Sequence, residues 1–215
     1  MSTGDAPAPL FYLAGLLGWN YFAQTFNSTS GVFTNNRELF HKVYFPRLAV
    51  PISSTISNLP ALLLNLVLFV VIAAIYGLCN PETTCLNIDS PALLLLVPLL
   101  ILIAGATGLA TGLWISALTA AYRDLSHLAS FLVQLWMYST PIIYTFASVP
   151  ERWKPLLALN PMTAVCEGFK RIFLGPGTGT LSTPMLASAT ALSLGALYLG
   201  FLLFRHAEDK FIDAI

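Results

Sequence analysis

Residues 62–77 read LLLNLVLFVVIAAIYG, and residues 93–108 read LLLLVPLLILIAGATG. Neither stretch carries a charge, and neither alternates apolar with polar side chains as the strands of a membrane barrel do. About 20 apolar residues in a helix cross a bilayer, and a helix satisfies its own backbone hydrogen bonds in lipid. These stretches therefore predict an α-helical membrane protein.

The rest of the chain has the same character. Of its 215 residues, 56% are hydrophobic and 9% are charged, whereas a soluble domain carries about 25% charged residues. Asp, Glu, Lys and Arg are missing from five long runs: 6–36, 48–81, 90–122, 125–150 and 172–204. We expect one all-α transmembrane domain over residues 1–215, a polytopic bundle with about five spans near 9–33, 49–78, 92–118, 128–146 and 185–204.

Two of these spans carry local signals. Pro141 lies inside the fourth span and should kink or divide it. In the third span Gly105, Gly108 and Gly112 recur at spacings of three and four, which favours close helix packing inside the bundle.

Residues 150–174 are too short and too charged to span a membrane. We expect short amphipathic helices there, with Asn160 as N-cap and Pro161 as first helical residue. The apolar stripe after Pro161 excludes Glu167, Lys170 and Arg171, so the helix should lie in the interface or dip into the outer leaflet. These three residues are either interfacial anchors or an outer gate or headgroup contact.

The densest polar segment lies between the first two spans, at residues 37–51, RELFHKVYFPRLAVP. It is either an ordinary solvated loop or a cytoplasmic loop, residues 34–48, that receives force from another protein. The residues we single out combine charges with aromatic rings: Arg37, Glu38, Phe40, Lys42, Tyr44, Phe45 and Arg47. A second polar turn contains Arg123 and Asp124.

The aromatic residues of the first and fourth spans allow two interpretations. Packing and interfacial anchoring is one; the other is a conduit in which flat rings stack on sugars. The candidates for the conduit are Trp19, Tyr21, Phe22, Trp136, Tyr138 and Tyr144.

Cys79 and Cys85 lie in or beside a loop with two acids and no Lys or Arg. An extracytoplasmic disulfide needs an oxidising compartment, and two unrelated thiols are the alternative. Two thiols with no nearby His make an incomplete metal site.

The charges favour one orientation. With residues 34–48 in the cytoplasm, six cations lie inside and four outside, which agrees weakly with the positive-inside rule. The zero net charge does not suggest nucleic acid as a partner.

The energy for any transport must come from elsewhere. The spans hold no ionisable residue of the kind that ion-coupled transporters use, and the chain has no phosphate-loop pattern. This favours a motor subunit in trans.

The chain resembles the permease subunits of ABC exporters for cell-surface polysaccharides, which export O-antigen, capsule and teichoic acid. The resemblance covers nearly the whole chain. The matching pieces are Gly15-Leu16-Leu17-Gly18-Trp19, Lys42-Val43-Tyr44-Phe45-Pro46-Arg47, Tyr122-Arg123-Asp124, Pro141-Ile142-Ile143-Tyr144, Val149-Pro150-Glu151-Arg152-Trp153, Leu159-Asn160-Pro161 and Glu167-Gly168-Phe169.

The resemblance implies a multi-pass permease of the bacterial cytoplasmic membrane. It implies a homodimer of permeases, two ATPase subunits that bind the ATP and Mg, and a lipid-linked glycan as substrate; no cofactor belongs to this chain. Such permeases have six membrane helices, so a first helix is missing here, either because the start is truncated or because the homologue is shorter.

Two other functions remain open: a permease for lipids or hydrophobic small molecules, and a non-transporting membrane scaffold. No hydrolytic or transferase site is expected.

Overall fold

The computed structural model describes residues 6–32, 48–79, 91–121 and 125–213 of the chain. The expected all-α bundle is confirmed in this part, where the one β-type pairing is an isolated bridge between Pro176 and Gly179. The long helices are α1 (Ala8–Ser30), α4 (Ala49–Ser57), α5 (Leu59–Cys79), α6 (Val97–Ala121), α7 (Leu125–Ser139), α9 (Pro161–Leu174) and α10 (Thr183–Asp213). The short elements are η1 (Pro91–Leu96), η2 (Phe146–Ser148) and α8 (Lys154–Ala158).

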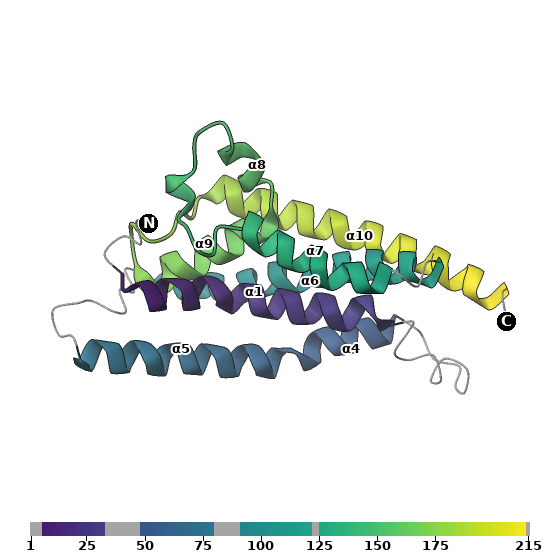
Figure 1. Cartoon of the computed structure of the whole chain (residues 1–215), viewed down its shortest axis with the longest axis horizontal. Coiled ribbons are helices and arrows are strands. Elements are labelled where there is room, and N and C mark those ends of the chain that lie inside the picture. Colours follow the sequence, from purple (N-terminus) through teal and green to yellow (C-terminus); the bar gives the residue numbers. More distant parts are fainter. Residues whose placement is uncertain (1–5, 33–47, 80–90, 122–124, 214–215) are drawn as a thin grey trace.

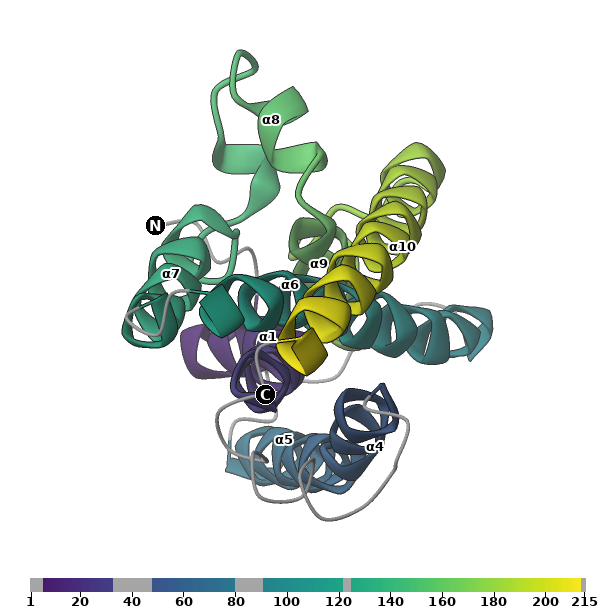
Figure 2. The ribbon, with the colours of Figure 1, turned by 90° about the vertical axis from the view of Figure 1, so that its right-hand side faces the viewer.

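Helices α1 and α6 form the centre of the bundle. Most long helices run along the same axis in Figure 1. In the view of Figure 2, α4 and α5 lie on one side of the central pair, whereas α7 and α10 lie around its other sides. Because α1 contacts α4, α5, α6, α7 and α9, it is the main link between the two sides of the bundle.

Three helical stretches are long and apolar enough to cross a membrane: Ala49–Cys79, Pro91–Thr119 and Thr183–His206. In the first and third, only 17% of the most apolar window is buried within the chain. Most side chains of these two helices therefore face outward, where lipid requires apolar groups.

Helix α1 is less apolar than helix α5, and it is surrounded mainly by other helices of the chain. Thirteen of its 23 residues are buried, among them Thr25, Thr29 and Ser30. A helix enclosed by other helices does not have to match the polarity of hydrocarbon, so α1 can be less apolar than α5, whose side chains mostly face outward. Among the described residues, three stretches meet the criterion of length and composition, and the expectation of about five spans stays a prediction.

Helix α7 is shorter than the fourth span expected at 128–146. It ends at Ser139, two residues before Pro141, and its 15 residues correspond to about 22 Å of helix, less than the roughly 30 Å of a hydrocarbon core. The prediction that Pro141 interrupts this span is confirmed.

The glycines of α6 let α1 approach closely. A Cβ atom on Gly108 would lie 2.9 Å from the carbonyl oxygen of Phe22, and one on Gly112 would lie 2.6 Å from Cβ of Thr29. The predicted close packing at these small residues is confirmed, and its partner is α1.

Candidate functional site

Helix α9 begins at a side-chain cap. Oδ1 of Asn160 accepts a hydrogen bond from the backbone N–H of Met162 at 3.1 Å, and Pro161 is the first helical residue, so the predicted cap is confirmed. The same amide also joins α9 to the end of α7, because its Nδ2 donates to Oγ1 of Thr140 at 3.0 Å. Nε1 of Trp136 donates to Oδ1 of Asn160 at 3.2 Å.

Helix α9 is inserted into the bundle. Twelve of its 14 residues are buried, and it contacts α1, α6 and α10. The close approach depends on glycine: a Cβ atom on Gly168 would lie 2.7 Å from Cδ1 of Leu100. The expectation that Glu167 and Lys170 lie on an interfacial polar face is therefore wrong, because the chain itself covers that face; Arg171 is partly buried.

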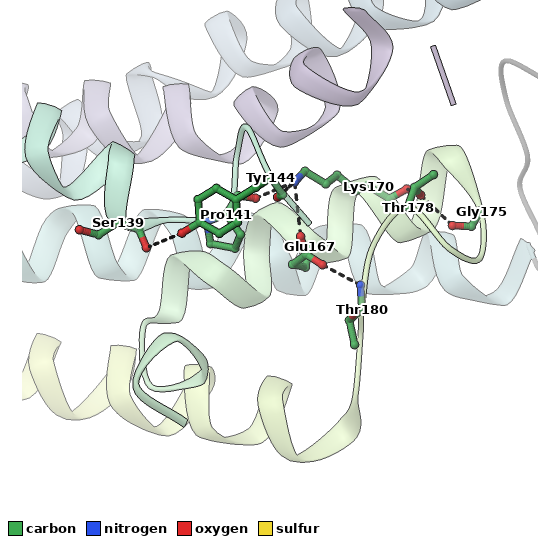
Figure 3. A network of polar contacts seen from close by, with 8 residues as sticks. All are labelled: Ser139, Pro141, Tyr144, Glu167, Lys170, Gly175, Thr178 and Thr180. Carbon is green, nitrogen blue, oxygen red and sulfur yellow. Dashed lines mark hydrogen bonds and ion pairs between the residues drawn. The ribbon is translucent and has the colours of Figure 1, made fainter. Parts of the chain in front are cut away.

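Glu167 and Lys170 form a fully buried ion pair. Nζ of Lys170 lies 3.3 Å from Oε1 of Glu167, and neither side chain has exposed surface. The ammonium also donates to the carbonyl oxygens of Pro141 at 2.6 Å and Tyr144 at 3.1 Å, as Figure 3 shows. It lies 4.0 Å from the ring centroid of Phe11 in α1, close enough for a cation–π interaction.

The carboxylate reaches in the opposite direction, to the segment that leads into α10. Oε2 of Glu167 accepts a hydrogen bond from the backbone N–H of Thr180 at 2.8 Å. The hydroxyl of Thr178 donates to the carbonyl oxygen of Gly175 at 2.8 Å, and Gly175 has a positive φ of 86°, which glycine adopts without strain. The ion pair therefore joins four segments: α1, residues 141–144, α9 and residues 175–180.

Burial dominates the electrostatics of this network. Helix α9 has 14 residues and is too short to span a membrane. Desolvation raises the pKa of the Glu167 carboxyl and lowers the pKa of the Lys170 ammonium. The attraction between the two groups opposes both shifts. Burial also raises the pKa of the neighbouring Cys166 thiol to about 12, which disfavours the reactive thiolate while α9 stays buried. The arrangement is suited to holding segments together rather than to chemical catalysis.

Many of the residues predicted to function lie outside the described part of the chain. They are Arg37, Glu38, Phe40, Lys42, Tyr44, Phe45 and Arg47 of the coupling loop, Arg123 and Asp124 of the second turn, and Cys85. Cys79 is the last residue of α5 and is exposed. The roles of these residues, and the pairing of Cys79 with Cys85, stay predictions.

The six candidate conduit aromatics do not share one environment. Trp19, Tyr21 and Phe22 are 3%, 4% and 0% exposed. The Trp19 and Phe22 rings lie 4.9 Å apart, and the Tyr21 hydroxyl donates to the carbonyl oxygen of Thr55 at 3.3 Å. These three contribute to the core of the bundle.

The other three candidates reach the surface to different extents. Tyr138 is 65% exposed, whereas Trp136 and Tyr144 are partly buried near the end of α7. Trp136 also touches the core, since its ring lies 5.0 Å from that of Phe22.

Several residues of the network were not predicted from the sequence: Phe11, Gly15, Thr178 and Thr180. A Cβ atom on Gly15 would lie 3.0 Å from Cε of Lys170, so this glycine makes room for the lysine stem. The spacing of Gly15 and Gly18 by three residues placed both on one helical face and could have indicated a close contact there. The sequence contains no comparable pattern that would have indicated the contacts of Thr178 and Thr180.

Comparison with known proteins identifies the family. The model of the family described as ABC-2 type transporter matches residues 7–174. The O-antigen export system permease protein RfbA of Myxococcus xanthus is 28% identical over 209 residues, which cover 96% of this chain and 76% of that protein. An O-antigen export system permease protein RfbA of Klebsiella pneumoniae is 23% identical over 208 residues, covering 96% of this chain and 75% of that protein. The matched region runs from α1 to the end of α9 and includes the buried ion pair, and the chain belongs to the ABC-2 type transporter family.

Proposed function

We propose that this protein is the permease subunit of an ATP-driven ABC exporter that moves a lipid-linked polysaccharide or oligosaccharide across the bacterial cytoplasmic membrane. The observation that carries the proposal is the similarity, over 96% of this chain, to permeases named for O-antigen export. The helical bundle, with its largely outward-facing apolar helices, supports a membrane transport role.

The energy in this proposal comes from partner subunits. Two ATPase subunits bind ATP and Mg beneath a homodimer of permeases. The coupling loop, residues 34–48, receives their motion, and the turn with Arg123 and Asp124 forms a second contact. This assignment agrees with a sequence that has no phosphate-loop pattern.

Helix α1 provides a physical route from the coupling loop to the buried ion pair. The loop lies between α1 and α4 in the sequence, and α1 contacts both α4 and α9. A helix transmits displacement along its length, since its backbone hydrogen bonds resist stretching. With the coupling loop on the cytoplasmic side, we assign α9 and the Glu167–Lys170 pair to the outer end of the pathway, where the pair holds α1, residues 141–144 and residues 175–180 against α9.

The proposal is tested by reconstitution. The chain is co-purified with candidate ATPases encoded near its gene, placed in nanodiscs, and assayed for ATP turnover with and without lipid-linked glycan. Stimulation by the glycan supports the proposal. Stimulation by simple lipids or hydrophobic small molecules instead would favour the alternative permease, and the absence of any associating ATPase would favour a scaffold.

The coupling loop is tested in the same preparation. Alanine at Phe40, Lys42, Tyr44 and Phe45 should abolish glycan-dependent ATP turnover while leaving membrane insertion intact. Leu63→Ala is the matched control, because Leu63 is 58% exposed on α5 and far in sequence from the loop. Loss of insertion in the loop variant, or unchanged turnover, would contradict the coupling role.

A further inference from the structure

The segment 150–159, which includes α8, stands off the side of the bundle. Figure 1 shows α8 beside the long helices rather than beyond their ends, and Figure 2 shows it apart from the central pair. Helix α8 contacts α10, and α10 contains the stretch Thr183–His206, which is long and apolar enough to cross a membrane. The segment therefore lies beside a membrane helix, where lipid can reach it.

Two adjoining hollows lie between this segment and the end of α7. They have volumes of about 370 and 360 Å³, and they share three lining residues: Ser139, Leu156 and Leu157. They therefore form one groove, which we call the α8 groove. Trp136 lines one half of it and Trp153 lines the other.

The lining of the α8 groove is mostly apolar, since leucine, tryptophan, valine and proline make up most of it. Apart from the N–H of Trp153, the side-chain donors in the lining already donate hydrogen bonds within the chain: Trp136, Ser139, Tyr144 and Asn160. An occupant rich in hydroxyls would find few partners here, and burying a polar group without a hydrogen bond is unfavourable. An alkyl chain carries no such cost and gains free energy by leaving water. The groove thus fits a hydrocarbon chain.

A cationic group lies next to one end of the groove, outside its lining. Cζ of Arg152 lies 5.6 Å from the ring centroid of Trp153, and Trp153 lines the groove. The nearby Lys154 is paired with Glu151 at 2.6 Å, whereas for Arg152 no ion pair is found within the part of the chain that the structure describes. A guanidinium can bind a phosphate through two parallel hydrogen bonds, and tryptophan is common at the level of lipid headgroups. This end of the groove therefore offers a phosphate contact beside a wall for hydrocarbon.

We infer that the α8 groove binds one phospholipid of the bilayer, with an acyl chain against Leu156 and Leu157 and the phosphate at the guanidinium of Arg152. The apolar wall and the cation at its end match the two parts of a phospholipid. The bound chain fills the space between α7 and the segment 150–159, so it stabilises the position of this segment. The inference does not depend on which substrate the protein exports.

The test is photocrosslinking in nanodiscs. The purified full chain is placed in nanodiscs that contain a phosphatidylglycerol with a diazirine in one acyl chain, and labelled residues are identified by mass spectrometry after illumination. We expect labelling of Leu156 and Leu157. A diacylglycerol with the same chains but no phosphate should label them about fivefold less, the factor that one cation near a membrane surface contributes. Arg152→Gln should lower labelling by phosphatidylglycerol to the level of the diacylglycerol.

Matched variants separate a site from general contact with lipid. Ser139→Phe places a ring where the two hollows meet and should abolish labelling of the groove. Labelling of Leu64, which is exposed on α5, should stay unchanged in the same sample and shows that the variant is folded in the membrane. Lys154→Gln is the control for Arg152→Gln, since Lys154 is already paired with Glu151, and it should leave labelling of the groove unchanged.

Several results would overturn the inference. They are an absence of groove labelling in the unaltered chain, equal labelling by the two probes, labelling that Arg152→Gln leaves unchanged, and labelling that survives Ser139→Phe. Displacement of the probe by polyprenyl phosphate but not by excess phosphatidylglycerol would identify a different lipid and would also overturn it. If Ser139→Phe does not fold, the comparison of the two probes and Arg152→Gln decide.

Discussion

Replacing Lys170 with methionine removes a positive charge from the interior while keeping most of the side-chain volume. The carboxylate of Glu167 then has no cation at 3.3 Å, although it keeps the N–H of Thr180. The carbonyl oxygens of Pro141 and Tyr144 lose a donor. The four segments that meet at the ion pair are all affected.

The magnitude follows from the complete burial of the pair. Removing one partner of a buried ion pair costs about 3–5 kcal/mol in free energy of unfolding, because the remaining charge is buried without compensation. The double variant Glu167→Gln/Lys170→Met removes both charges, and the glutamine can still accept from Thr180. We expect the double variant to recover about 2 kcal/mol relative to Lys170→Met, because it leaves no uncompensated buried charge. The single variant Glu167→Gln completes a double-mutant cycle, from which the coupling energy is obtained.

Cys166 provides a native probe for the measurement. Its side chain is fully buried in α9, so a thiol-reactive dye modifies it only when α9 opens. With Cys79 and Cys85 replaced by serine, the rate of dye reaction during thermal unfolding in nanodiscs reports the stability of this helix. The double-mutant cycle then gives the coupling between Glu167 and Lys170.

The surface pair of Lys154 and Glu151 is a matched control, since it has the same spacing of three residues and an N–O distance of 2.6 Å. Because the Glu151 side chain is largely exposed, Lys154→Met should cost less than about 1 kcal/mol. The reasoning is refuted if Lys170→Met is as stable as the unaltered chain, or if the double variant is no more stable than the single one.

Three further predictions concern packing, coupling and the thiols. Gly112→Val should destabilise the α1–α6 contact by about 2 kcal/mol or more through overpacking. Gly195→Ala is the control and should be neutral or stabilising, because a Cβ atom there meets nothing within 4 Å. Thermal unfolding of the two variants is the measurement. Single alanine substitutions at Phe40, Lys42, Tyr44 and Phe45 should reduce glycan export more than they reduce the amount of protein in the membrane, as measured by surface glycan and membrane immunoblots. If Cys79 is paired with Cys85, external maleimide should label this region only after reduction, and equal labelling without a reductant would disprove the disulfide.

Some features of this protein followed from short-range patterns. The charge-free runs indicated a helical membrane bundle, since helices satisfy their backbone in lipid. Asn160 and Pro161 marked the start of α9, and Pro141 marked the interruption after α7, because caps and prolines act on the adjacent backbone. Gly108 and Gly112 indicated a close helix contact, though not its partner.

The sequence by itself thus determined the class of fold, the main helices and their local boundaries. Only the tertiary structure decided which helices face outward and which are enclosed. It placed α1 at the centre, although α5 is the more apolar helix, and it buried the Glu167–Lys170 pair that the amphipathic pattern had placed on a surface. The physical reason is that the burial of a side chain depends on neighbours distant in sequence: the ammonium of Lys170 binds carbonyl groups 29 and 26 residues away, and no local pattern encodes those contacts.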